Sequence, residues 1–160
     1  MNAIFPGSFD PLTLGHVNIA QRSSAFVDKL VVAVLDNPHK SPLFSTEERV
    51  MLLKEFFKED ANIEVEAFSG LLVDYAVKKG INVIIRGVRG PEDLSKELPY
   101  AKWNHDIASS SIETIYMPTA QDLSHISSSI IKEIAAYDIT KIANTVPHIV
   151  YLALKAKYST

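Results

Sequence analysis

The sequence has no cysteine among its 160 residues. This absence excludes disulfides, thiolate metal sites and cysteine nucleophiles, and it fits a reducing compartment, so we expect a cytoplasmic protein. Long apolar segments are missing too. The longest aliphatic run, Leu30 to Leu35, is far shorter than the roughly 18 apolar residues of a membrane helix, and the N-terminus lacks a basic region followed by an apolar stretch. We therefore expect neither membrane insertion nor secretion.

Positive charge is scarce as well. The formal net charge is −3, and lysine and arginine form no tract. This balance argues against a protein that binds nucleic acid through its phosphate backbone, so an anionic ligand must be held by a few local groups. The histidines are scattered, with no H-E-x-x-H and no pair at helical ligand spacing. We therefore expect no metal site built by the protein alone.

The length of the chain fits one globular domain over residues 1–160. Apolar β-rich runs predict five strands, at 3–5, 29–35, 63–68, 82–85 and 113–117. Helical patterns cover about 15–26, 71–79, 93–107 and 127–137, and a last helix is predicted after Pro147. Ser45 and Glu48 have capping-box spacing, which predicts the start of another helix. Continuously apolar strands indicate a parallel sheet covered by helices on both faces. The predicted fold is a single doubly wound α/β domain, with ligands outside the carboxyl ends of its strands.

A turn-rich segment, PGSFDPLTLGH, follows the first predicted strand and ends at His16. Gly15 stands at the mouth of the next helix, where free backbone N–H groups and the helix dipole favour a phosphate. Glycine lets a ligand approach the backbone, and His16 can donate a hydrogen bond to it. The alternative is an inert connection between a strand and a helix.

Cationic side chains follow two other predicted strands. Lys40 lies in the proline-flanked segment DNPHKSPLF after the second strand, where a lysine that is merely solvated is the alternative. Arg86 and Arg89, with glycines beside them, follow the fourth strand and suggest bidentate phosphate binding. The alternative for this pair is ion pairing with the nearby carboxylates of Glu92 and Asp93.

Three consecutive serines, Ser127 to Ser129, begin the predicted helix over 127–137. A serine at a helix start is commonly an N-cap and no more. Three in succession supply more hydroxyls and free N–H groups than one cap uses, so the segment is a second candidate for phosphate binding.

The first-loop motif, Thr13-Leu14-Gly15-His16, resembles the H/T-x-G-H hallmark of a nucleotidyltransferase superfamily. Its longer form, P-G-S-F-D-P-x-T-x-G-H, is similar to that of the bacterial phosphopantetheine adenylyltransferases. So are the lysine followed by P-x-F, the R-G-V-R segment and the I-S-S-S run, in the same order. The resemblance implies a Rossmann-like nucleotidyltransferase fold and transfer of the adenylyl group of ATP to 4'-phosphopantetheine, giving dephospho-coenzyme A and pyrophosphate in coenzyme A biosynthesis. It also implies Mg2+ on the ATP phosphates, a homohexamer, and coenzyme A as a candidate feedback ligand.

The resemblance also implies roles for individual residues. His16, Lys40 and Arg89 would be catalytic. The acceptor phosphopantetheine would be bound by Ser8, Lys40, Leu72, Arg86 and Asn104. ATP would be bound by Ser8, Phe9, His16, Gly87, Val88, Arg89, Glu97, Leu123, Ser124, His125, Ile126, Ser127, Ser128 and Ser129.

Some segments depart from the family's pattern. The family's D-F-E-Y-E reads DLSKE over residues 93–97, and an aromatic-serine-aromatic triplet reads LSH over 123–125. Lys132 stands where the wider superfamily often has arginine, so the charge is kept without the bidentate fork. The alternatives are adenylyl or cytidylyl transfer to nicotinate mononucleotide or glycerol phosphate, and a non-catalytic nucleotide-binding regulator.

Overall fold

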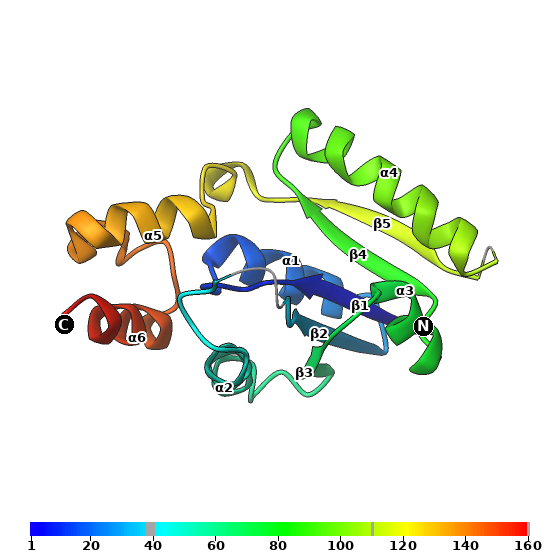
Figure 1. Cartoon of the computed structure of the whole chain (residues 1–160), viewed down its shortest axis with the longest axis horizontal. Coiled ribbons are helices and arrows are strands. Elements are labelled where there is room, and N and C mark those ends of the chain that lie inside the picture. Colours follow the sequence, from blue (N-terminus) through cyan, green and yellow to red (C-terminus); the bar gives the residue numbers. More distant parts are fainter. Residues whose placement is uncertain (38–40, 110, 160) are drawn as a thin grey trace.

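The computed structural model describes residues 1–37, 41–109 and 111–159. Within that part of the chain, five parallel strands form one sheet with the order β3-β2-β1-β4-β5 (Figure 1). The strands are β1 (Asn2–Gly7), β2 (Lys29–Leu35), β3 (Ile63–Phe68), β4 (Val83–Val88) and β5 (Glu113–Pro118). The predicted five-stranded parallel sheet is confirmed.

The helices alternate with the strands and then follow them at the end of the chain. They are α1 (Leu14–Ser24), α2 (Thr46–Phe56), α3 (Leu72–Lys78), α4 (Pro91–Ile107), α5 (Ser128–Tyr137) and α6 (His148–Tyr158), with short 3-10 turns η1 (Gln121–Leu123) and η2 (Ile139–Ile142). The predicted capping box of α2 is confirmed, since Ser45 Oγ accepts from the Glu48 N–H and the Glu48 carboxylate accepts from the Ser45 N–H. Among the described helices, none is long and apolar enough to span a membrane.

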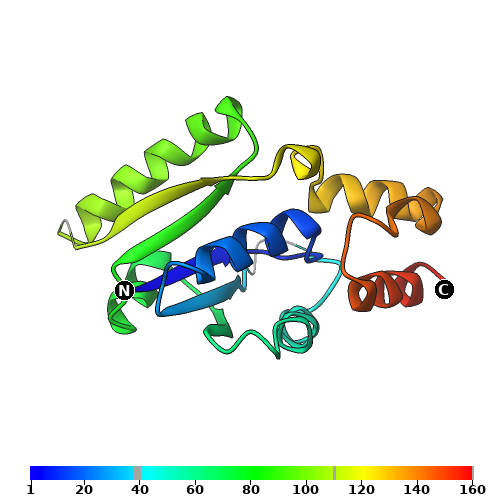
Figure 2. The same cartoon turned by 180° about the vertical axis from the view of Figure 1, so that it is seen from behind.

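Alternate residues of the strands face two separate apolar cores. In β2, Leu30, Val32 and Val34 join a core that includes side chains of α1, α2, α5 and α6, whereas Val31 and Ala33 join another with side chains of α3. Figure 2 shows α1 in front of the sheet. Because helices cover both faces, the central strands are apolar on both sides, as a doubly wound fold requires.

The carboxyl ends of the strands point toward α5 and α6, which lie beyond that edge of the sheet (Figure 1). The predicted end of the fourth strand at residue 85 was wrong, because β4 continues through Arg86 and Gly87 to Val88, in register with β5. Pairing with β5 thus overrides the weak strand preference of glycine. A Cβ on Gly87 would lie 3.0 Å from Ile19 Cγ1, so glycine at this position also allows α1 to pack closely against the sheet. Helix α4 begins at Pro91, two residues before the predicted start, with proline in its first turn.

Candidate active site

Three adjoining cavities open at the carboxyl edge of the sheet. The central cavity, about 310 Å³, lies between the ends of β1 and β4 and the first turns of α1, α4 and α5. The residues that matter for its chemistry are Gly7, Thr13, Gly15, His16, Arg86, Gly87, Arg89, Asp93, Lys96, Glu97, Thr119, Ile126, Ser127 and Ser128.

The other two cavities share walls with the central one. The edge cavity, about 500 Å³, includes Ser8, Leu35, Leu72, Arg86, Glu97, Tyr100 and Asn104 in its lining. The loop cavity, about 390 Å³, includes Ser8, Phe9, Asp10, His16, Arg49, Ser128, Ser129 and Lys132. Arg86 and Glu97 line both the central and the edge cavity, whereas His16 and Ser128 line both the central and the loop cavity. The predicted phosphate-binding residues in the described part of the chain therefore each line at least one of these three adjacent cavities.

His16 is the third residue of α1 and forms part of a capping box with Thr13. The Thr13 side chain accepts from the His16 N–H at 3.3 Å, and the Thr13 N–H donates to His16 Nδ1 at 3.2 Å. Because Nδ1 accepts this hydrogen bond, the neutral ring carries its proton on Nε2. The ring is thus held by one nitrogen and keeps the other as a donor.

Burial lowers the pKa of His16 to about 4, and the positive charges of Arg89 and Arg86 lower it in the same direction. The imidazole is therefore neutral at pH 7. Phe9 supports the ring from the side, edge-on with 5.1 Å between the ring centroids. A neutral, oriented donor at a helix N-terminus is suited to an anionic group whose charge is balanced by nearby arginines.

Phe9 has a positive φ of 49°, an uncommon conformation for a bulky residue, and its side chain is only 2% exposed. A Cβ on Gly7 would lie 2.9 Å from the Phe9 ring, so glycine is needed beneath it. Phe9 was predicted to bind ATP. Its side chain lies beneath the first loop, where it supports His16 and lines the loop cavity.

The two arginines of the R-G-V-R segment both hold carboxylates of α4. Arg86 donates from Nε and Nη2 to the two oxygens of Glu97, each at 2.7 Å, and Arg89 donates from Nε and Nη2 to Asp93 at 2.7 and 3.1 Å. The ion-pairing alternative is thus observed for Arg89 with Asp93, whereas the partner of Arg86 is Glu97, nearly two turns into α4. Both guanidinium groups still line the central cavity.

The serines of the I-S-S-S run separate into different roles. Ser127 is the N-cap of α5, with its hydroxyl accepting from the Ile130 N–H at 3.3 Å, and it lines the central cavity. Ser128 donates to the Pro11 carbonyl at 2.8 Å and so ties α5 to the first loop. Ser129 is exposed and lines the loop cavity. One serine is therefore an ordinary cap, and the start of the helix still faces the cavity.

The predicted acceptor-binding residues within the described part of the chain meet in one place. Ser8, Leu72, Arg86 and Asn104 come from the first loop, α3, β4 and α4, and all four line the edge cavity. Lys40 lies outside the described residues, and its role stays a prediction.

Several predicted ATP ligands lie away from the lining of the central cavity. Val88 is buried at the end of β4, and His125 is exposed before α5. Ser124 donates to the Gln121 carbonyl at 2.8 Å. A Cβ on Gly15 would lie 3.9 Å from the Leu123 carbonyl oxygen, so the backbone of Leu123 lies near the start of α1. Their parts in ATP binding stay predictions.

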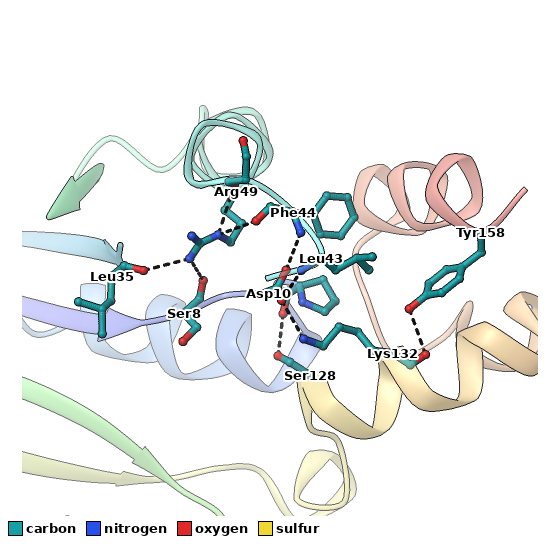
Figure 3. A network of polar contacts seen from close by, with 11 residues as sticks. Ser8, Asp10, Leu35, Leu43, Phe44, Arg49, Ser128, Lys132 and Tyr158 are labelled. Atoms are coloured by element: carbon teal, nitrogen blue, oxygen red, sulfur yellow. Dashed lines mark hydrogen bonds and ion pairs between the residues drawn. The ribbon is translucent and has the colours of Figure 1, made fainter. Parts of the chain in front are cut away.

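Sequence reasoning missed a buried polar network in the wall of the loop cavity (Figure 3). Asp10 is 5% exposed and accepts from the N–H groups of Leu43 and Phe44 at 3.0 and 2.9 Å and from Lys132 Nζ at 2.8 Å. Burial alone would raise the pKa of Asp10, but Lys132 and the two N–H groups lower it overall. Lys132 thus forms an ion pair with Asp10, which joins α5 to the first loop and to the backbone of Leu43 and Phe44 before α2.

Arg49 is the second missed residue, 3% exposed on the inner face of α2. Its position four residues before the buried Leu53 was the available signal, since such spacing places both on one helix face. Asp10 had a weaker signal, its place inside the first-loop motif. No local pattern pairs Asp10 with Lys132, because 122 residues separate them.

A parallel sheet with a capped histidine, an arginine pair and a serine-capped helix at its carboxyl edge defines a nucleotidyltransferase. A family model described as cytidylyltransferase-like matches residues 4–134. Among solved structures, the nicotinic acid mononucleotide adenylyltransferase of Plasmodium falciparum, complexed with NaAD, is similar with a TM-score of 0.70 and 13% identity, covering 99% of this chain and 95% of that one. At this identity the likeness establishes the fold alone.

Curated relatives are far more similar in sequence. The phosphopantetheine adenylyltransferase of Lachnoclostridium phytofermentans is 45% identical over 159 residues, covering 98% of this chain and 97% of the relative. That of Alkaliphilus metalliredigens is 42% identical, with 96% and 97% covered. The chain belongs to the phosphopantetheine adenylyltransferase family.

Proposed function

We propose that the protein transfers the adenylyl group of ATP to the phosphate of 4'-phosphopantetheine, giving dephospho-coenzyme A and pyrophosphate in coenzyme A biosynthesis. The observation that carries this proposal is that Arg86 lines both the central and the edge cavity. An acceptor with a phosphate at one end and a long arm can place its phosphate at Arg86 and its arm along Leu72 and Asn104 in the edge cavity. ATP would then occupy the central cavity, with its phosphates near His16 and Arg89.

In the proposed reaction, an oxygen of the acceptor phosphate attacks the α-phosphorus of ATP in line. The bond from the α-phosphorus to the bridging oxygen breaks, and pyrophosphate leaves. The acceptor oxygen is already anionic, so the reaction needs no nucleophilic side chain. Catalysis then consists of positioning and charge stabilisation.

Each cationic or donor group has a proposed task. Arg86, together with Lys40, holds the acceptor phosphate, and Arg89 with the N-terminus of α5 holds the leaving pyrophosphate. The Nε2 proton of His16 is directed at the α-phosphate as it becomes five-coordinate. The carboxylates of Glu97 and Asp93 accept the hydrogen bonds from Nε and Nη2 of these two arginines, so substrate phosphates must replace the carboxylates to bind there.

We also propose that Mg2+ accompanies ATP. Over the described ranges, no three histidine, aspartate or glutamate side chains gather as a ligand set. Mg2+ usually binds through substrate phosphates and water, and we propose that the phosphates of ATP hold it here. When bound, the ion would neutralise charge on the leaving pyrophosphate.

The remaining parts of the proposal concern the whole protein. We propose one domain over residues 1–160, supported by Val150 and Leu154 of α6, which are buried in the same core as α1. We propose a cytoplasmic homohexamer with coenzyme A as a feedback ligand. The exposed Tyr100 and Trp103 on α4 support self-association, since large exposed apolar side chains on one helix favour an interface.

The choice of acceptor is tested by steady-state kinetics. Purified protein with ATP and Mg2+ should release pyrophosphate with phosphopantetheine and much less with nicotinate mononucleotide or glycerol phosphate. Equal or better kcat/KM with nicotinate mononucleotide would overturn the assigned acceptor. Absence of pyrophosphate release with every acceptor would favour a non-catalytic nucleotide-binding regulator.

A further inference from the structure

Arg49 carries a buried positive charge that the reaction as proposed does not use. Its side chain, 3% exposed, is surrounded by oxygen acceptors (Figure 3). Its nitrogens donate to the carbonyls of Phe44 (3.1 Å), Ser45 (3.3 Å), Ser8 (2.8 Å) and Leu35 (3.1 Å), and to the hydroxyl of Thr46 (2.8 Å). All three nitrogens of the guanidinium group are therefore engaged.

These acceptors are neutral. Among the described residues, no carboxylate lies within ion-pair distance of Arg49. Arg49 reaches a carboxylate only indirectly, through the Thr46 hydroxyl, which accepts from Arg49 Nη2 and donates to Asp36 at 2.9 Å. Burying a charge without a counter-ion is costly unless hydrogen bonds compensate it, and an apolar side chain could fill the same space. The guanidinium group therefore suggests a task other than packing.

The positions of the acceptors indicate that task. Nη1 of Arg49 donates to both Ser8 and Leu35, so one nitrogen joins the first loop to the carboxyl end of β2. Nε donates to Phe44, at the other end of the segment that follows β2. Arg49 thus holds together the first loop at Ser8, the carboxyl end of β2 at Leu35 and the backbone of Phe44 before α2.

Ser8 connects this network to the substrates. It lines both the edge cavity and the loop cavity, next to Arg86 in the former. A shift of the Ser8 backbone relative to Arg86 would change the space available to an acceptor phosphate. The arginine pair itself is held separately, by α4.

We propose that Arg49 is a positioning residue for adenylyl transfer, which acts through Ser8 and Leu35 in the wall of the edge cavity to align the acceptor phosphate. The inference rests on the proposed function. Arg49 affects the acceptor more than ATP, because Nη1 holds Ser8 and Leu35, which line the edge cavity, whereas Arg89 lines the central cavity. A misplacement of about 1 Å can lower a rate by roughly 10²-fold.

The test is the variant Arg49→Lys, which keeps the charge but has a single nitrogen in place of Nη1, which binds Ser8 and Leu35, and Nε, which binds Phe44. We expect the KM for phosphopantetheine to rise at least about tenfold, the KM for ATP to change less than about threefold, and titration calorimetry to show the same bias in binding. The matched control is Arg22→Lys, since Arg22 is exposed and also donates to a carbonyl, that of Pro118, at 2.6 Å. The control should bind both substrates like the wild type.

A second variant covers the case in which Arg49→Lys does not fold. Thr46→Val is nearly isosteric and removes only the acceptor of Nη2 and the link to Asp36. We expect it to fold and to raise the KM for phosphopantetheine a few-fold, with the KM for ATP unchanged.

The outcomes separate this inference from the proposed function. A wild type that neither binds phosphopantetheine nor transfers an adenylyl group to it would refute the proposed function. If the wild type is active, folded variants with unchanged KM values, with equal increases in both KM values, or with a lower Tm alone would overturn the role of Arg49.

Discussion

The substitution His16→Ala removes one hydrogen-bond donor from the central cavity. With its pKa lowered to about 4, the ring is neutral at pH 7, and the Thr13 N–H on Nδ1 leaves the proton on Nε2. A donor directed at the five-coordinate α-phosphate contributes to the transition state more than to bound ATP. Loss of one such preorganised donor typically costs about 10²- to 10³-fold in kcat, roughly 3 to 4 kcal/mol. We expect that loss, with little change in the KM for ATP.

The same substitution also costs stability, and the two effects must be separated. It removes the hydrogen bond from the Thr13 N–H at 3.2 Å and the edge contact with Phe9. A cap interaction contributes about 1 kcal/mol and an aromatic pair about 0.5 to 1.5 kcal/mol, so unfolding should become easier by about 2 kcal/mol. The Tm should therefore fall as well.

The second capping box of the chain supplies the matched control. Glu48 occupies the same position in α2 as His16 in α1, and its carboxylate accepts from the Ser45 N–H at 2.7 Å. Glu48→Ala should lower the Tm while keeping kcat. Pyrophosphate release and a melting curve are measured on the same preparation of each variant. A folded His16→Ala protein with near-normal kcat would refute the role assigned to His16.

Other predictions concern the arginine pair and pH. Asp93→Asn removes the ion pair with the Arg89 guanidinium group, so that ATP no longer competes with a carboxylate there. Because exposed ion pairs contribute at most about 1 kcal/mol, the KM for ATP should fall by up to about fivefold. An unchanged or higher KM in initial-rate assays would contradict this. Arg86→Lys should weaken acceptor binding more than ATP binding, and Arg89→Lys should weaken ATP binding more than acceptor binding. If calorimetry shows that both variants bind both ligands like the wild type, the two arginines serve only in ion pairs with α4. Because the pKa of His16 is lowered from 6.5 to about 4, the unfolded chain takes up a proton there at higher pH than the folded chain. The free energy of unfolding should therefore be unaffected by this residue above pH 6.5 and fall by at most roughly 3 kcal/mol toward pH 4. Urea unfolding at pH 7 and 4.5 measures this fall, and an equal fall in His16→Ala would show that another group causes it.

The sheet and the edge that carries the site were predictable because they depend on local patterns. Apolar runs such as 30–35 indicate a strand covered on both faces, and the parallel order places all carboxyl ends at one edge. The capping box at Ser45 and Glu48 has a fixed spacing and was confirmed. The end of β4 was not predictable, because Gly87 has a weak strand preference and yet pairs with Met117 of β5.

The pairing of charges in the site depends on tertiary structure and was only partly predictable. The Arg89–Asp93 pair was an alternative from the sequence, since four residues separate the two. Glu97 as the partner of Arg86 depends on the direction in which α4 leaves β4. The contact of Lys132 with Asp10 depends on α5 docking against the first loop. Local spacing carries no information on such distant contacts.

Adenylyl transfer from ATP to phosphopantetheine moves the α-phosphorus of ATP to the acceptor. A measurement of which phosphorus reaches the acceptor therefore tests the proposed reaction. The protein is incubated with Mg2+ and phosphopantetheine, once with ATP labelled at the α-phosphorus and once with ATP labelled at the γ-phosphorus. If the adenylyl group is transferred, the α-label appears in dephospho-coenzyme A and the γ-label in pyrophosphate. A γ-label in the acceptor, or no label in the acceptor from either ATP, would contradict it.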